Sequence, residues 1–133
     1  MPVITVWMIR ISLIYLLITV LTGSLILAHK ALDLHPSFWA LLPVHIEIAI
    51  FGWVLQFVLG TAYWIFPRFI RGSARGKKSV GWLMVILLNA GIFFTAIPGL
   101  EERAALLGRT ALFGAVVLFL ILIWGRVVSY RDI

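Results

Sequence analysis

Four long apolar runs dominate this sequence and limit what the chain can fold into. The first covers residues 11–28 without a charge, and the others cover about 43–66, 80–97 and 104–124. Each run is close to the roughly 20 residues that an α-helix needs to cross a bilayer. A backbone in lipid must also satisfy its own hydrogen bonds, as helices do. The sequence therefore predicts an all-α membrane protein, a four-transmembrane-helix bundle that forms a single domain over residues 1–133.

The composition excludes the main alternatives to a membrane protein. Of the 133 residues, 63% are hydrophobic and 12% are charged, whereas soluble domains have about 45–50% apolar and about 25% charged residues. No cysteine is present, which excludes disulfides, thiolate metal sites and iron–sulfur clusters. We find no nucleophile elbow, phosphate loop or dinucleotide fingerprint, so soluble enzyme classes have no support.

The basic residues predict how the helices are oriented. Most of them flank the runs on one side: Arg10, Arg68, Arg71, Arg75, Lys77, Lys78, Arg126 and Arg131. Lys and Arg concentrate in the cytoplasmic segments of membrane proteins. We therefore expect both termini to lie in the cytoplasm. We expect the chain to lie in the inner (plasma) membrane of the cell. We expect the basic loop to contact anionic lipid and not nucleic acid.

The second run carries the chemistry-bearing side chains. His45 and Glu47 are ionisable residues inside a span, which is costly and points to function. The helical face that carries His45 continues through Gly52, Gln56 and Gly60, so it is small and nearly flat. This face suits close helix packing or a flat macrocycle with the histidine as axial ligand. Spacing alone favours packing.

A second histidine supports the macrocycle. His29 ends the first run, so His29 and His45 both lie near the outer surface and are predicted to hold a metal, as the two axial ligands of a haem iron. With His35 they would instead form a Zn or Cu site. Alternatively, His29 and His35 are interfacial side chains that bind water.

Two arginines lie at the depth expected for haem propionates. Arg103 and Arg109 are predicted to bind these carboxylates, because guanidinium suits a carboxylate bidentately; contact with lipid headgroups is an equal alternative. Glu47 is expected to pair with Arg109 or Arg103, or to accept a proton.

The stretch from His45 to Arg68 carries the landmarks H-x6-G-W, x6-G-x2-Y-W and F-P-R. It resembles the second transmembrane helix of subunit I of the haem-copper oxidase superfamily, nearest to the cbb-type oxidase and nitric oxide reductase branches. The run over residues 80–97, with Asn89 in its middle, resembles the third helix of that family. The resemblance implies that His45 ligates a low-spin haem b and that Tyr63, Trp64 and Pro67 belong to the exit turn.

The chain also departs from that family, whose members have twelve or more spans and take their other ligands from later helices. We therefore expect a b-type cytochrome that transfers electrons, and not a complete oxygen or nitric oxide reductase. The missing axial ligand would come from His29 or from His45 of a second copy in a homodimer, with quinol or a respiratory complex as partner. The alternatives are a non-catalytic accessory or assembly subunit of a respiratory complex, or a small metal or proton conduit using His29, His45 and Glu47.

Overall fold

The computed structural model describes residues 1–67 and 76–127, and these are almost entirely helical. The elements are α1 (Val3–Leu32), the 3-10 helix η1 (Pro36–Ala40), α2 (Leu41–Glu47), the π-helix η2 (Ile48–Leu55), α3 (Gln56–Ile65), α4 (Lys78–Ala96) and α5 (Glu102–Trp124). No β-strand forms within the described ranges. Arg68, Arg71, Arg75 and Arg131, which contribute to the predicted orientation, lie outside them.

Within residues 1–67 and 76–127, four helices are long and apolar enough to cross a membrane, so the prediction of an all-α fold with four candidate spans is confirmed for this part of the chain. Elements η1, α2, η2 and α3 follow one another without a break and form one rod, Pro36–Ile65. Helix α1 begins at Val3, well before the uncharged run that starts at residue 11. Arg10 is exposed on this extension, and its long side chain can reach the interface while its stem stays apolar.

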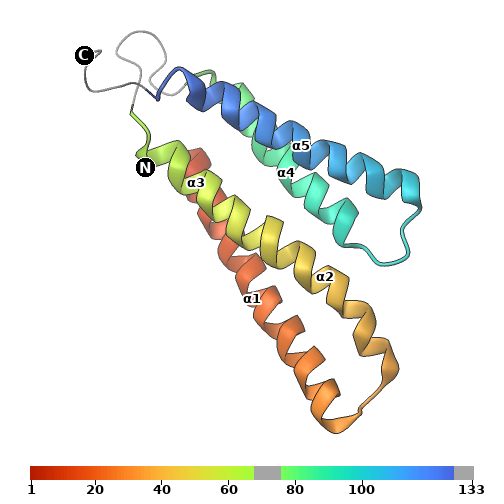
Figure 1. Cartoon of the computed structure of the whole chain (residues 1–133). Helices are drawn as coiled ribbons and strands as arrows, with labels where there is room; N and C mark the ends of the chain where they lie inside the picture. The colour runs from red at the N-terminus through yellow and green to blue at the C-terminus, as the bar shows by residue number, and fades with distance from the viewer. Residues whose placement is uncertain (68–75, 128–133) are drawn as a thin grey trace.

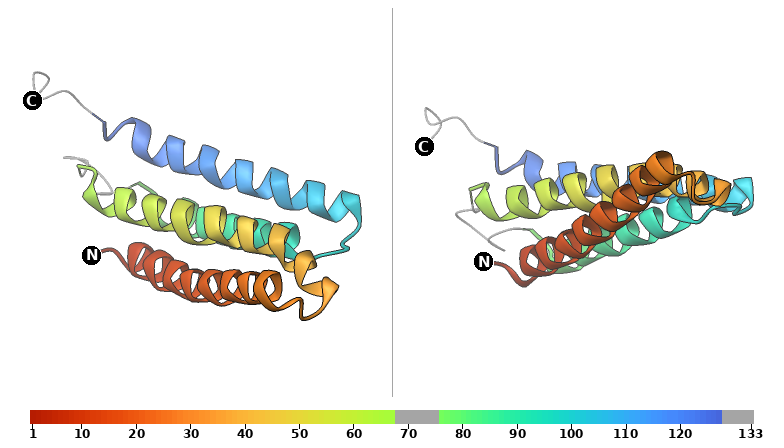
Figure 2. Two further views of the ribbon diagram at one scale, coloured as in Figure 1. Left: turned by 60° about the horizontal axis from the view of Figure 1, so that its bottom comes forward. Right: turned by 90° about the horizontal axis from the view of Figure 1, so that it is seen from below.

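The helices are arranged as two hairpins (Figure 1). The first hairpin pairs α1 with the α2–α3 rod, and the second pairs α4 with α5. Helices α4 and α5 approach closely because Gly91 and Gly108 face each other: a Cβ built on Gly91 would come within 2.9 Å of the Gly108 carbonyl oxygen. Small residues at such a crossing let two backbones approach within the membrane. Figure 2 shows the four long helices running roughly alongside one another.

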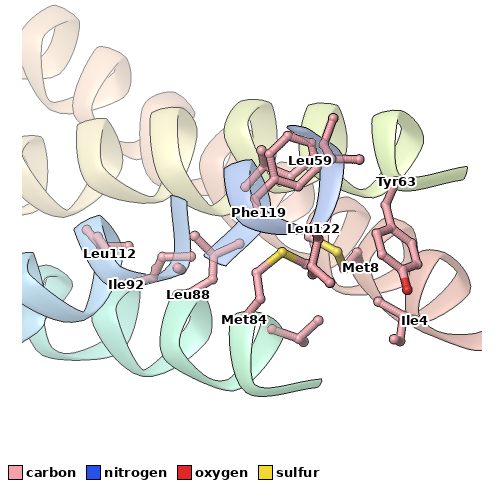
Figure 3. Close-up of a cluster of buried hydrophobic side chains, with 13 residues drawn as sticks. Ile4, Met8, Leu59, Tyr63, Met84, Leu88, Ile92, Leu112, Phe119 and Leu122 are labelled. Carbon is pink, nitrogen blue, oxygen red and sulfur yellow. The ribbon is translucent and has the colours of Figure 1, made fainter. Parts of the chain in front are cut away.

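The two hairpins share a buried core, and their loops lie apart at one end. The buried core joins both hairpins, with Ile4 and Met8 from α1, Tyr63 from α3, Met84 from α4 and Phe119 from α5 (Figure 3). Toward the loops that follow α1 and α4, the ribbons of the hairpins separate (Figure 1). The core therefore joins the hairpins where the chain begins. We call the opposite end the open end, because the loops after α1 and α4 lie apart there, although α2 still lies beside α4.

A buried arginine closes the joined end. Arg126 is only 1% exposed, and its guanidinium donates to the carbonyl oxygens of Tyr63 at 3.0 Å, Phe66 at 2.6 Å and Pro67 at 2.7 Å. The last carbonyls of a helix have no partner within the helix. Arg126 thus caps α3 from the end of α5, a role that its place among the flanking charges does not predict.

Much of the apolar surface stays exposed. Leu17 is 60%, Phe113 72% and Trp124 80% exposed. In water such a surface would be a strong liability, whereas in lipid it has no such cost because the acyl chains are equally apolar. This exposure agrees with four helices that lie in a membrane.

Candidate functional site near His45 and Glu47

The rod changes its hydrogen bonding directly after the two ionisable residues. Glu47 ends α2, and the next eight residues, Ile48–Leu55, form the π-helix η2. A π-helix bonds i to i+5, is rare, and occurs frequently at functional sites. Glu47, Phe51 and Leu55, which are four residues apart, line one groove, while Gly52 faces α1.

His45 lies against α1 and is held through one ring nitrogen. Its Nδ1 is 3.1 Å from the carbonyl oxygen of Thr19 and 3.2 Å from Oγ1 of Thr22. A carbonyl oxygen only accepts, so Nδ1 carries the hydrogen and donates it. In the neutral ring, Nε2 then keeps its lone pair. Metal-ligating histidines characteristically donate their other ring N–H to a backbone carbonyl or carboxylate in this way.

A glycine makes room for this ring. A Cβ on Gly23 would come within 2.8 Å of His45 Cε1, which is closer than side-chain packing permits. The position of the imidazole therefore depends on the absence of a side chain at residue 23. Together with Thr19 and Thr22, Gly23 forms a seat on α1 that the sequence analysis missed. The signal is present as a T-x2-T-G stretch on an otherwise aliphatic helix.

His29 has a different environment. It is 4% exposed, and its Nδ1 accepts the backbone N–H of His35 at 3.2 Å. Its ring stacks on Phe38 at 5.9 Å and meets Trp39 edge-on at 5.6 Å. Because Nδ1 is an acceptor here, Nε2 carries the hydrogen in the neutral ring. His29 thus closes the turn after α1, and in this conformation it offers no free lone pair.

The structure does not bring the predicted histidine ligands together. His45 contacts Thr22, and His29 is seven residues further along α1, or about 10 Å at 1.5 Å per residue. His35 is exposed and its Nδ1 is 2.7 Å from Oγ of Ser37. Over residues 1–67 and 76–127, no group of three His, Cys, Asp or Glu side chains is placed to hold a metal ion. A three-histidine Zn or Cu site is therefore not formed by the described residues.

The small face below His45 packs against α1. A Cβ on Gly52 would come within 2.6 Å of Tyr15 Cγ, and one on Gly60 within 2.9 Å of Met8 Cβ. Gln56 is fully buried, and its Nε2 donates to the carbonyl oxygen of Met8 at 3.3 Å. Side chains of α1 thus fill the space beside Gly52 and Gln56, as the packing interpretation of the spacing expects.

A further polar contact ties the two hairpins together. The hydroxyl of Tyr15 on α1 donates to Oδ1 of Asn89 on α4 at 3.2 Å, and Asn89 Nδ2 donates to the carbonyl oxygen of Val85 at 2.9 Å. Hydrogen bonds between helices are the usual role of amides at mid-membrane depth. Asn89 therefore has a structural contact, and Tyr15 is a member of the seam that the sequence analysis did not single out.

Glu47 faces away from this seam and into a groove between the rod and α5. We call it the Glu47 groove; its volume is about 400 Å³, and Glu47, Phe51, Leu55, Arg109, Leu112, Phe113 and Val116 line it. Oε2 of Glu47 is buried and has no hydrogen-bond partner. Arg109 lines the same groove but makes no ion pair with Glu47. The structure thus places Glu47 and Arg109 on the same groove, but it does not show the ion pair that the sequence analysis predicts between them.

The two arginines lie close to each other at the open end. Arg103 and Arg109 are both exposed, and they line a second hollow of about 460 Å³ with Glu102. Their guanidinium groups are free to bind an anionic group presented from outside the bundle. This agrees with both of their predicted roles, propionate binding and contact with lipid headgroups.

Comparison with known proteins does not assign the chain. No protein-family model, no curated protein and no solved structure matches it. The likeness of its second span to the haem-copper oxidase helix thus stays a prediction from the landmarks at His45, Gly52, Gly60 and Tyr63.

Proposed function

We propose that this protein is a four-span membrane cytochrome that binds haem b through His45 and carries single electrons. One observation carries the proposal: His45 Nδ1 lies 3.1 Å from the Thr19 carbonyl oxygen. Because that oxygen can only accept, the ring hydrogen belongs on Nδ1 and Nε2 is left as a ligand. Haem b supplies one-electron redox chemistry when bound, because its iron alternates between the ferric and ferrous states. The protein residues fix the ring of His45 and so the direction of its lone pair.

The other residues fit a haem only in part. Arg109 and Arg103 are exposed at the open end, where guanidinium groups can bind propionates. Gly52 and Gln56 are covered by α1, so they would support the rod and not contact the group. The proposal therefore rests on His45 and the two arginines.

The second axial ligand is proposed to come from a second copy of the chain. His29 is engaged by the His35 backbone N–H and lies about 10 Å along α1 from the His45 seat. Two-fold homodimers are the commonest oligomers, and in such a dimer each copy would contribute one His45. This arrangement predicts one haem for two chains.

The proposed setting is a respiratory inner (plasma) membrane with both termini in the cytoplasm. The support is the excess of Lys and Arg at the end where the chain begins, of which Arg10, Lys77 and Lys78 are described and exposed. Quinol or a respiratory complex would then supply the electron.

The test is a reduced-minus-oxidised visible spectrum of the purified protein, expressed with ample haem. We expect a sharp b-type α band, a ratio of one haem to two chains, and loss of the band in His45→Ala. His35→Ala is the matched control, because the side chain of His35 is exposed and its hydrogen bonds are to Ser37. A colourless wild-type protein, or a band that survives in His45→Ala, would overturn the proposal.

A second candidate function has an observation of its own. The seam of Gly52, Gln56 and Gly60 is already filled by Tyr15 and Met8, as in a helix pair that needs no cofactor. An accessory or assembly subunit of a respiratory complex would use such a bundle without haem. The colourless outcome of the same experiment would favour this candidate.

A further inference from the structure

The Glu47 groove has the features of a ligand-binding site and is separate from the proposed haem ligand His45. His45 points onto α1 at Thr19, whereas the groove lies between the rod and α5. Its floor and walls are apolar apart from two charged side chains, Glu47 and Arg109. Pockets of this kind, apolar with a few convergent polar groups, are the usual binding sites for small molecules.

Glu47 is the unexplained group in this groove. Its Oε2 is buried without any hydrogen-bond partner, and a buried unpaired acceptor is costly. Arg109 lines the same groove and is not bonded to it. A ligand that reaches both side chains would satisfy the carboxyl group with a donor and the guanidinium with an acceptor.

We propose that the Glu47 groove binds a membrane-dissolved hydroquinone, that is, a quinol. The two hydroxyl groups of a hydroquinone stand at opposite ends of one flat ring. One hydroxyl donates to Glu47 Oε2, and the oxygen of the other accepts from Arg109. The ring lies among apolar side chains, of which Phe51 and Phe113 are aromatic and can stack on it.

The Glu47 groove is open to the apolar interior of the bilayer, in which a quinol dissolves. Phe113 is 72% exposed on a helix long and apolar enough to cross a membrane. A quinol thus enters sideways from the bilayer, with no passage through water.

A phospholipid headgroup fits this groove less well. Its phosphate would be drawn to Arg103 and Arg109 in the neighbouring hollow, and that would leave Glu47 Oε2 unpaired. An anionic phosphate placed deeper would lie beside the Glu47 carboxyl group and be repelled. The charge pattern therefore favours a neutral ligand that carries both a donor and an acceptor.

The experiment measures binding of decylubiquinol to the full chain in phosphatidylcholine nanodiscs, as depletion of free quinol relative to protein-free nanodiscs. We expect saturable binding that weakens about tenfold in Glu47→Gln and in Arg109→Gln, because each replaces a hydrogen bond to a charged group with a weaker bond to a neutral amide. Glu102→Gln and Arg10→Gln are the matched controls, since both side chains are exposed and lie outside the groove. Circular dichroism and size-exclusion elution check that each variant folds.

A third groove variant, Phe113→Ala, keeps both charges and should weaken binding through the lost ring contact. Binding that does not saturate, or that falls equally in the controls, would overturn the proposal. So would a co-purifying phospholipid that quinol does not displace and that Arg109→Gln releases. His45→Ala separates the two proposals: it should lose haem and keep quinol binding, so a failure of either is seen alone.

Discussion

At the scale of single residues, the contact between His45 and Gly23 links helix packing to ligand chemistry. The imidazole occupies the space that a Cβ at residue 23 would need, 2.8 Å from Cε1. Its Nδ1 is bonded at the same time to Thr19 and Thr22. The ring is thus fixed by shape on one side and by hydrogen bonds on the other, as a ligand with a set direction requires.

Gly23→Ala is expected to lower haem occupancy several-fold while the chain still folds. Alanine favours a helix over glycine by about 1 kcal/mol, so the helix itself gains, but the new methyl group must displace the His45 ring. The measurement is the b-type absorbance per chain, with thermal unfolding alongside. Ser24→Ala, at the exposed neighbouring position, should leave the absorbance unchanged. An unaltered haem content in Gly23→Ala would show that the His45 seat has no part in binding.

At the scale of secondary-structure elements, hydropathy predicts the helices but not their rotation. The four apolar runs each become part of a long helix, because length and apolarity decide spanning. Which face of a span packs inward is left open, since lipid and protein interior are equally apolar. The separation of His29 from His45 and the burial of Gly52 against Tyr15 follow from that rotation.

Two local features of the site also lack a sequence signal. The π-helix Ile48–Leu55 contains no proline or other residue that would mark a change in winding, so a regular α-helix is what periodicity predicts. Arg126 belongs to the flanking positive charges in the sequence, yet it caps α3 from a distant segment. Both depend on tertiary contacts, which a single sequence does not display.

The α4–α5 hairpin gives a test at this scale. Gly91→Ala should destabilise the protein by about 1–3 kcal/mol, because overpacking at a tight contact forces the backbones apart: the new Cβ would lie 2.9 Å from the Gly108 carbonyl oxygen. Gly114→Ala on the same hairpin is the control, since its Cβ would meet only Leu87 Cδ1 at 3.8 Å. Unfolding in mixed micelles, followed by tryptophan fluorescence, measures both. Equal stability of the two variants would contradict this account of the crossing.

At the scale of the whole molecule, the bundle has a closed end and an open end. The shared core and Arg126 join the hairpins where the chain begins, and the Glu47 groove lies toward the end where the loops after α1 and α4 are apart. His45 is near that same end, beside Thr22 on α1. The proposed redox group and the proposed quinol site would thus be on one side of the membrane, which makes the orientation of the chain decisive for its function.

Single cysteines can determine that orientation, because the chain contains none. If both termini are cytoplasmic, Leu34→Cys and Glu101→Cys should react with a membrane-impermeant maleimide on intact cells, and Ser79→Cys only after permeabilisation. Leu34 follows α1, Glu101 precedes α5 and Ser79 lies in the first turn of α4. All three positions are exposed, so each thiol is accessible in its own compartment. The reverse pattern, or equal labelling of all three, would refute the proposed orientation. The expected pattern would place His45 and Glu47 toward the outer face, so that protons released by an oxidised quinol would leave on the side opposite the basic loop.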